Sequence, residues 1–432
     1  MMDYRQYEIS GASAQARDSF ELALAELLSW RDGAQAHLDR AILEAPGFTM
    51  AHVLSAYMSV WSRDVRRVRR AREAHARASR LAATPREQLH SAAIGAALRD
   101  DFATLGRLLD ELLERYPRDI LALHSSHVLD YLTGDLEHMA SRVSRVLPAW
   151  SVEVPGFHSV LAMQAFSAVE RAAYRLADEA GHWALELNPW DARAHHALVH
   201  VFEMTGDAIA GKRWMRDRAP FWSVDTVVAI HCWWHTALFH LALGEHEAAL
   251  DLYDRCVRRE RSPEIADLID ASALLWRMEL QGVDTGSRWL ELADAWEGHL
   301  ADGYCSFNDL HATLALVGAE NWQGAKRLEA RLLRASKLAT RYGETTRVIG
   351  LPACRAMIAF GRGDFARTIE LLSGIPAFAR RIGGSHAQRD LMSLTLREAV
   401  RRNYRRCLRG LIAIPSGSTI ARSLPSPLPA AP

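Results

Sequence analysis

The sequence lacks the features that mark secreted, membrane-spanning or nucleic-acid-binding proteins. Its five cysteines include no CxxC pair and are an odd number, which predicts a reducing compartment. No run of about 18 apolar residues occurs and the chain starts with polar residues, so we expect a cytoplasmic protein without membrane contact. Lysine plus arginine and aspartate plus glutamate both number 52, and this zero net charge gives no general attraction to nucleic acid.

Residues that favour β-structure are also sparse. Alanine, leucine, arginine and glutamate dominate, and most of the 15 prolines lie between segments of helical periodicity or near the C-terminus. A chain of 432 residues is long for one hydrophobic core, whereas a repeat array grows by stacking. The composition therefore predicts an all-α protein made of repeated units.

A glycine followed by an acidic residue recurs between the helical segments. The four instances are Gly134-Asp135, Gly206-Asp207, Gly244-Glu245 and Gly363-Asp364. We expect each glycine to end a first helix in the left-handed conformation, and each acid to stabilise the start of the second helix. The step from the second to the third instance is close to the roughly 34-residue period of a tetratricopeptide repeat.

These units predict an all-α, tetratricopeptide-type α-α superhelix of at least ten degenerate helical hairpins. Further hairpins are expected around residues 34–60, 88–116, 157–187, 267–301, 307–335 and 348–378. The predicted superhelical domain covers residues 1–404. Residues 405–432 are rich in serine, proline and arginine, and we expect this tail to be disordered.

The first helix of each tetratricopeptide unit lines the concave groove. Residues about 13, 10, 6 and 3 positions before the closing glycine share the inward face, because these offsets follow the helical period. Before Gly206 and Gly244 they are Arg193, His196, His200 and Glu203, and His231, Trp234, Leu238 and Leu241, with His235 beside them. Before Gly134 they are Leu121, His124, Val128 and Tyr131.

Two histidine pairs on consecutive first helices are the strongest chemical signal. His196 with His200, and His231 with His235, have the i,i+4 spacing that places both imidazoles on one helix face. Together with Glu203 they offer a ligand set for iron, manganese or zinc. The same imidazoles could instead transfer protons without a metal.

Other side chains are candidates for holding a ligand in the groove. Trp234 offers a flat aromatic surface, and Tyr131 lies on the inward stripe of an earlier unit. Near the C-terminus, His386, Arg389 and Asp390 follow a Gly-Gly-Ser helix start. A superhelix that curls through a full turn would bring these three residues across the groove, where they would close the pocket.

Several segments resemble the tetratricopeptide repeat protein 38 family over nearly the whole predicted domain. The matching segments are Ala194 to Met204, His231 to His240, Tyr304 to Ala312, Gly350-Leu351-Pro352 and Gly383 to Asp390. The resemblance implies functional roles for His196, His200, Glu203, His231, His235, Asn308, Asp309, His311, His386, Gln388, Arg389 and Asp390. His195 and His158 lie outside the family pattern.

The family also resembles repeat proteins of toxoflavin-type azapteridine biosynthetic clusters. This likeness implies an oxidoreductase that acts on a nitrogen heterocycle in secondary metabolism. Our leading hypothesis is therefore an enzyme with a small-molecule substrate, with or without a metal, and a homodimer is one expected assembly. We assign catalysis to the four histidines with His386 and Asp390, and metal binding to the four histidines with Glu203. The predicted substrate-binding residues are Tyr131, Trp234, Asn308, Asp309, His311, Gln388 and Arg389.

The alternative is a non-catalytic scaffold that holds a peptide or protein partner in the groove. We also expect the groove histidines to contribute little to packing, so that truncation of His200 or His235 leaves stability nearly unchanged.

Overall fold

The computed structural model describes residues 1–62, 64–375 and 379–412. Within these ranges the regular secondary structure is helical and no β-strand occurs. The β-type pairing is limited to two isolated bridges, Met2 with Glu8 and Arg31 with Thr226. The all-α prediction is confirmed. No helix in the described ranges has the length and apolar character needed to cross a membrane.

Ten helical hairpins follow one another along the described chain, and the two helices of each hairpin contact each other. They are α1 (Ala14–Leu28) with α2 (Ala34–Glu44), α3 (Thr49–Val60) with α4 (Val65–Ala78), α5 (Pro85–Leu98) with α6 (Phe102–Arg115), α7 (Ile120–Thr133) with α8 (Leu136–Val146), α9 (Phe157–Glu170) with α10 (Tyr174–Leu187), α11 (Ala192–Thr205) with α12 (Ala208–Trp222), α13 (Ala229–Ala242) with α14 (His246–Leu252), α15 (Ile265–Leu280) with α16 (Arg288–Glu297), α17 (Ser306–Gly318) with α18 (Trp322–Ala335), and α20 (Leu351–Gly361) with α21 (Phe365–Leu372). This confirms the predicted superhelix of at least ten hairpins.

Short helical segments and one long helix complete the chain. They are η1 (Leu147–Ala149), η2 (Tyr253–Val257), α19 (Arg341–Thr345), η3 (Thr346–Gly350), η4 (Ala379–Ile382), α22 (His386–Arg389) and α23 (Leu391–Ile412). The predicted tail begins at residue 405, but α23 continues through Ile412, so the helical body is longer than expected. The remainder of that predicted tail, 413–432, lies outside the described residues.

One predicted hairpin has the wrong register. The segment 34–60 contains α2 and α3, which belong to consecutive hairpins, because α1 at the N-terminus is the partner of α2. The other predicted segments contain the hairpins α5–α6, α9–α10, α15–α16, α17–α18 and α20–α21, and residues 376–378 of the last segment lie outside the described residues.

The recurrent glycine and acid act at the helix ends as the sequence indicates. The four glycines all have left-handed backbone angles, with φ of 69° at Gly134 and 76° at Gly206. The aspartate side chains that follow accept hydrogen bonds from the first turn of the next helix, as Asp207 does from the Ala210 amide at 3.0 Å. Glu245 is the exception, because its side chain pairs with Lys212 at 2.7 Å and makes no capping hydrogen bond to α14.

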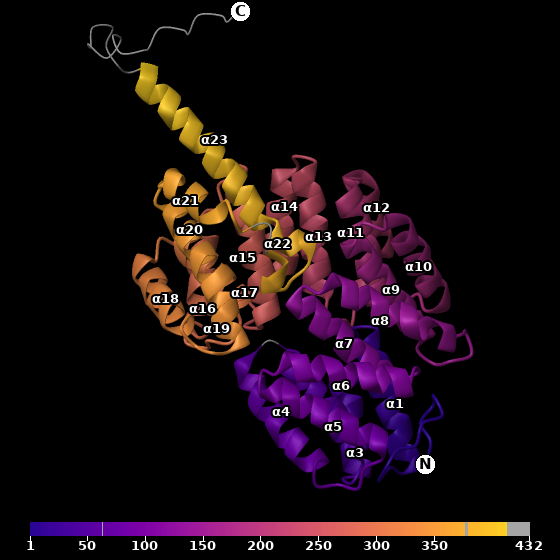
Figure 1. Ribbon diagram of the computed structural model, residues 1–432. Helices are drawn as coiled ribbons and strands as arrows, with labels where there is room; N and C mark the ends of the chain where they lie inside the picture. The colour runs from indigo at the N-terminus through magenta and orange to yellow at the C-terminus, as the bar shows by residue number, and fades with distance from the viewer. Residues whose placement is uncertain (63, 376–378, 413–432) are drawn as a thin grey trace, which may run out of the picture.

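The last segments return to the middle of the superhelix, as Figure 1 shows for α22 beside α13 and α15. The Tyr131 hydroxyl on α7 donates to Gln388 Oε1 at 2.8 Å, across 257 residues of sequence. Glu170 at the end of α9 accepts from the His386 amide at 2.9 Å and pairs with Arg389 at 3.1 Å. These contacts close the groove over its central units.

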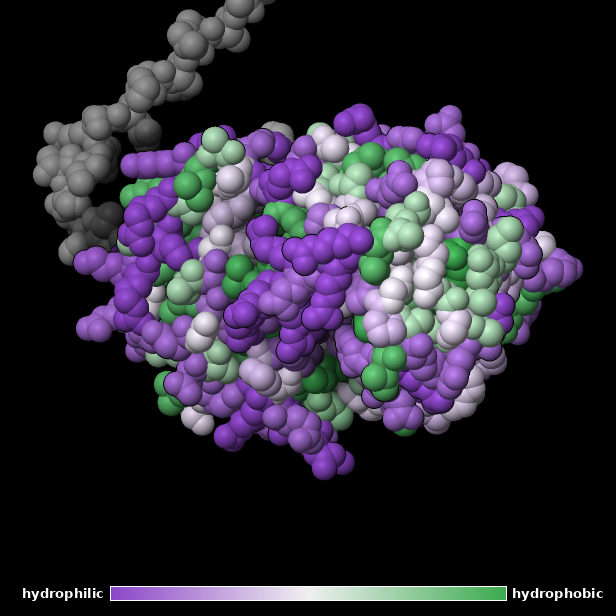
Figure 2. Space-filling model, turned by 90° about the horizontal axis from the view of Figure 1, so that it is seen from below, coloured by the Kyte–Doolittle hydropathy of each residue, from purple (hydrophilic) through white to green (hydrophobic). Residues whose placement is uncertain are grey.

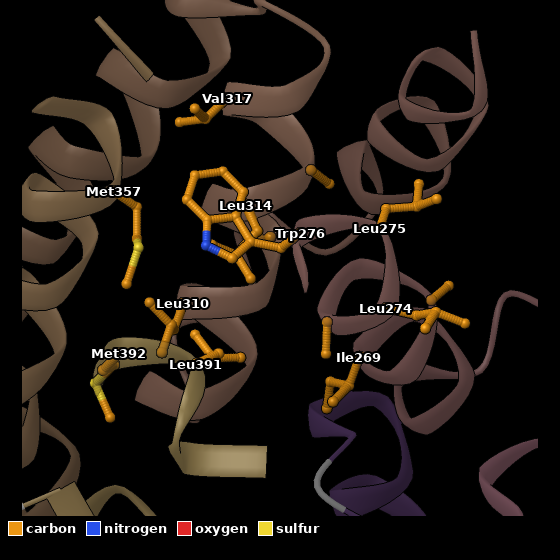
Figure 3. Close-up of a cluster of buried hydrophobic side chains, with 14 of the residues drawn as sticks. Ile269, Leu274, Leu275, Trp276, Leu310, Leu314, Val317, Met357, Leu391 and Met392 are labelled. Atoms are coloured by element: carbon orange, nitrogen blue, oxygen red, sulfur yellow. The ribbon is translucent and has the colours of Figure 1, made fainter. Parts of the chain in front are cut away.

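Two large hydrophobic clusters stabilise the two halves of the superhelix, one spanning Ile9 to Ala194 and one spanning Trp234 to Ala399. The second cluster includes α23, and Figure 3 shows Leu391 and Met392 among the same apolar side chains as Trp276. The last helix is therefore part of the core of the C-terminal half.

On the outside, the face in Figure 2 is largely hydrophilic on its left, and apolar residues gather on its right.

Candidate metal centre

Two consecutive first helices, α11 and α13, carry the histidine pairs predicted from the sequence. Asp191 caps α11 by accepting the Ala194 amide at 3.1 Å, which fixes where the helix begins. The sequence analysis anticipates the convergence of His196, His200, His231 and His235, and the structure places these four imidazoles side by side. Because one residue of each pair follows the other by four positions, each helix directs both of its rings to the same side.

The four imidazoles are close enough to share one metal ion. Each offers one nitrogen, and these nitrogens all lie within 4.8 Å of one another. His196 Nε2 is 3.0 Å from His200 Nε2 and 3.1 Å from His231 Nε2. A metal ion bound at 2.0–2.1 Å from each nitrogen requires neighbouring nitrogens about 3.0–3.4 Å apart. The two spacings at His196 Nε2 therefore fit metal ligation.

Two carboxylates lie behind this cluster. Asp270 Oδ2 on α15 accepts from His231 Nδ1 at 2.9 Å, which leaves Nε2 of that ring turned toward His196. Glu203 Oε2 lies 3.0 Å from His235 Nδ1. The hydrogen bond to Asp270 orients the imidazole of His231 and makes it more basic. Glu203 Oε2 makes no hydrogen bond within the described residues, despite its closeness to His235. Glu203 was predicted as a ligand, but it is not among the residues whose donor atoms converge.

Burial keeps three of the four imidazoles uncharged at neutral pH. His200 and His235 are fully buried and His196 is 4% exposed. Removal from water lowers the pKa of each of these three imidazoles well below its usual value, and neighbouring imidazoles lower it further. Burial also raises the pKa of Glu203. Neutral imidazole is the form that binds a metal.

This burial contradicts the expectation that the groove histidines contribute little to packing. His196 lies against two other aromatic rings, stacked on Phe166 with centroids 5.7 Å apart and tilted toward Trp30 at 5.2 Å. Phe166 also meets His200 edge-on at 5.4 Å. The imidazoles are part of the interior because the closing segments cover the groove.

A cavity of about 300 Å³ adjoins the cluster, and His196 and His231 form part of its wall. Aromatic side chains from several units line it: Trp30, Trp61, Tyr131 and Phe166. Cavities of this size accept small molecules and are commonly apolar with a few polar groups. Glu203 lines a second cavity of about 410 Å³, together with Arg277 and Asp390. The histidine cluster thus has a cavity next to His196 and His231, and its carboxylate Glu203 faces another.

Of the predicted substrate-binding residues, Tyr131 and Gln388 line the cavity beside the histidines. Trp234 does not line it, because its side chain is fully buried and its ring stacks on His231 with centroids 5.2 Å apart. Trp234 therefore supports the imidazole and leaves no surface for a ligand. Arg389 pairs with Glu170 and belongs to the closing contact.

The segment around residue 310 does not join the cavity. Asp309 is paired with Arg331 and accepts from the Tyr342 hydroxyl at 2.9 Å. His311 Nδ1 is 2.8 Å from the Phe307 carbonyl oxygen. Asn308 and Asp309 instead line a separate void of about 10 Å³, too small for a substrate. Asp309 thereby joins α17 to α18 and α19.

The two predicted catalytic residues near the C-terminus take separate positions. His386 has an exposed side chain, and its backbone amide makes the contact with Glu170. Asp390 pairs with Arg277 at 2.5 Å and lines the second cavity with Glu203. Neither residue lies among the four convergent histidines.

Several residues of the site were missed by the sequence analysis. Asp270 lies on a first helix that ends without the glycine-acid signal, so the counting rule was not applied to it. Phe166 lies on α9, which also ends without that signal. Arg193 was placed on the inward stripe but given no role, although it lines the cavity. Acidic and aromatic residues on the inward faces of all first helices, including those without a closing glycine, were the signal that could have identified these residues.

The chain is an all-α superhelix of the tetratricopeptide type, and its centre encloses four histidines beside a cavity. No protein-family model matches the sequence. Among solved structures, the human IFIT1 dimer with m7Gppp-AAAA is similar at 13% identity, with a TM-score of 0.43 and coverage of 94% of this chain and 96% of that chain. The P58(IPK) TPR domain is similar at 12% identity, with a TM-score of 0.22 and coverage of 91% and 99%.

Proposed function

We propose that the protein binds a divalent transition metal through His196, His200, His231 and His235 and uses it on a small molecule held in the adjacent cavity. The observation that carries the proposal is the convergence of four imidazole nitrogens within 4.8 Å. An all-imidazole ligand set suits iron, zinc or copper better than manganese, which prefers oxygen ligands. Of the metals expected from the sequence, iron and zinc therefore fit best.

The charges around the cluster support a divalent ion. The imidazoles of His196, His200 and His235 carry no charge at neutral pH, and the carboxylates of Asp270 and Glu203 lie close to His231 and His235. Carboxylates behind the ligands help to balance the charge of a divalent ion. His196 and His231 line the cavity, so a bound metal would lie next to whatever molecule the cavity holds.

The reaction that the family resemblance implies is the oxidation of a nitrogen heterocycle. In the simplest form, a dihydro-heterocycle loses two electrons and two protons to dioxygen, which leaves as hydrogen peroxide. The aromatic cavity wall, with Trp61 and Phe166, suits a planar ring of this kind. Iron supports such electron transfer and zinc does not.

A peptide-binding scaffold is the second candidate, and the tetratricopeptide-type superhelix itself supports it. The central groove argues against an extended peptide, because Gln388 crosses to Tyr131 and Arg389 to Glu170 over this part of the superhelix. What remains is a cavity of about 300 Å³, which matches a small molecule.

Metal analysis of protein purified without a histidine tag tests the proposal. We expect about one equivalent of metal per chain in the wild-type protein. The metal affinity of His196→Ala and of His200→Ala should be at least tenfold lower. His52→Ala is the matched control, since this histidine is 4% exposed and bonds only the Pro46 carbonyl oxygen at 2.9 Å. Wild-type protein that stays metal-free after incubation with iron and zinc would overturn the metal site. Oxygen consumption with a dihydropteridine then tests the reaction separately.

A further inference from the structure

Six arginines are nearly fully buried in the described structure, and one of them stands apart. Their exposed fractions lie between 3% and 7%: Arg5, Arg86, Arg142, Arg193, Arg258 and Arg277. Five of the six form an ion pair with a carboxylate, among them Arg86 with Asp119 at 3.2 Å and Arg258 with Glu291 at 2.5 Å. Arg193, the most buried of the set, forms no ion pair within the described residues.

No carboxylate lies within ion-pair distance of Arg193 in the described residues, although the more distant Asp191 partly offsets the effect of burial on the pKa of this arginine. Arg193 Nη2 donates to His124 Nδ1 at 3.0 Å, and burial lowers the pKa of that imidazole well below its usual value. The guanidinium lies 4.8 Å from the ring centroid of Trp30. Nε of Arg193 is buried and has no hydrogen-bond partner. Burial lowers the pKa of Arg193 to about 10, so the side chain is still a cation at neutral pH.

Arg193 lines the cavity beside the histidine cluster, and so do two carboxylates that do not neutralise it. Asp270 is engaged with His231, and Asp267 has a pKa raised by burial. Both lie on α15, outside ion-pair distance of the guanidinium. Trp61, also in the cavity wall, has a buried indole Nε1 without an acceptor. The cavity wall therefore includes a guanidinium that has no carboxylate partner within the described residues.

We infer that the cavity is a binding site for a small planar anion, a carboxylate or the deprotonated oxygen of a heterocycle, and that Arg193 provides its counter-charge. An isolated buried charge is unfavourable, and the other five buried arginines show how this chain resolves it. A bound anion would give Arg193 the partner that the protein does not provide. The aromatic residues Trp61 and Phe166 supply the flat apolar surface for the ring of the ligand.

The inference rests on the proposed function only in treating this cavity as the substrate site. Because the anion site depends on Arg193 and the metal site on the histidines, the two proposals fail separately. If the protein takes up no metal but binds an anion more tightly than a neutral molecule of the same shape, only the metal proposal is wrong. If the protein binds metal but does not prefer the anion, only the anion site is wrong.

Binding of a pair of probes with the same shape but different charge tests the anion site. Quinoline-3-carboxylate and quinoline-3-carboxamide have the same shape and differ in charge, and neither chelates a metal. Trp30 and Trp61 line the cavity, so quenching of tryptophan fluorescence reports binding, and calorimetry confirms it. We expect the carboxylate to bind at least tenfold more tightly than the carboxamide.

Two variants assign this preference to Arg193. In Arg193→Met the preference should disappear, while affinity for the carboxamide and metal content stay unchanged. In Arg193→Lys, which keeps the charge, most of the preference should remain. Arg175→Met, which removes an arginine with a 90% exposed side chain, is the control for net charge. Equal binding of the two probes by wild type, binding of neither up to about 1 mM, or a preference that survives in Arg193→Met would each overturn the inference.

Discussion

The Nε2 atoms of His196 and His231 lie 3.1 Å apart, although the two residues belong to consecutive hairpins and are separated by 35 positions. The rings meet because α11 and α13 are neighbouring first helices that contact each other and turn these side chains toward the same side. Two i,i+4 pairs stacked in this way form a four-nitrogen site from only two helices. In this superhelix, the stacking of two hairpins thus brings four histidines together at one place.

The carboxylate behind His231 should control metal affinity. Asp270→Asn removes the negative charge from the outer nitrogen of this ligand but keeps all four imidazoles. We expect a 10- to 100-fold weaker affinity for zinc, the typical cost of losing such an outer partner. Asp267→Asn is the control, since Asp267 lines the same cavity on the same helix. Competition with a chromogenic chelator measures both variants, and equal affinities would argue against the role of Asp270.

The metal-free protein should lose stability in mild acid. The imidazoles of His196, His200 and His235 have pKa values well below 6.5 when folded, whereas in the unfolded chain they bind protons near pH 6.5. The unfolded state therefore takes up more protons as the pH falls below about 6.5, and the free energy of unfolding decreases by up to about 1.4 kcal/mol per pH unit for each group. Above about pH 6.5 these three histidines are neutral in both the folded and the unfolded state, so they no longer reduce the stability.

Thermal unfolding of the chelator-treated protein between pH 5 and pH 8 checks this dependence. The double variant His200→Ala with His235→Ala should show a shallower decline of Tm below about pH 6.5. His182→Ala, a side chain 46% exposed on α10, serves as the control. A slope that is identical in all three proteins would mean that other groups cause the acid sensitivity.

The two buried arginines Arg86 and Arg193 should respond differently to the same substitution. Arg86→Met leaves Asp3 and Asp119 buried without their cation and should lower the free energy of unfolding by about 3 kcal/mol. Arg193→Met removes a cation that has no carboxylate partner, so its effect in ligand-free protein should stay within about 1 kcal/mol. Urea unfolding of both variants compares them, and a loss as large as that of Arg86→Met would indicate a structural role for Arg193.

The closing contact depends on one buried carboxylate. The side chain of Glu170 is 2% exposed and joins α9 to the His386 amide and the Arg389 guanidinium. Glu170→Ala leaves this arginine without its partner and should cost about 3 kcal/mol, with faster hydrogen exchange confined to residues 383–390. Glu137→Ala, which breaks the exposed pair with Arg171, should cost less than about 1 kcal/mol. Unchanged exchange in 383–390 would show that other contacts hold the segment.

Much of the fold and the core of the candidate site could be predicted from the sequence, because both depend on local periodicity. A helical repeat of 3.6 residues and the recurrent glycines indicate where several helices stop and which residues face inward. This places His196 with His200, and His231 with His235, on the inward faces of consecutive first helices, and the packing of α11 on α13 brings the two pairs together. The capping aspartates are equally local, as Asp207 shows.

Only the tertiary structure decided which other residues join the histidines. The family resemblance implied a role for His311, but α17 packs it elsewhere, while Asp270 on α15 completes the site. Burial was likewise decided by the return of α22 across the groove, a contact between residues as far apart as Tyr131 and Gln388. Sequence periodicity fixes the direction of a side chain on its own helix. The long-range packing of helices determines its neighbours, its exposure to water and, for Arg193, the absence of a partner charge.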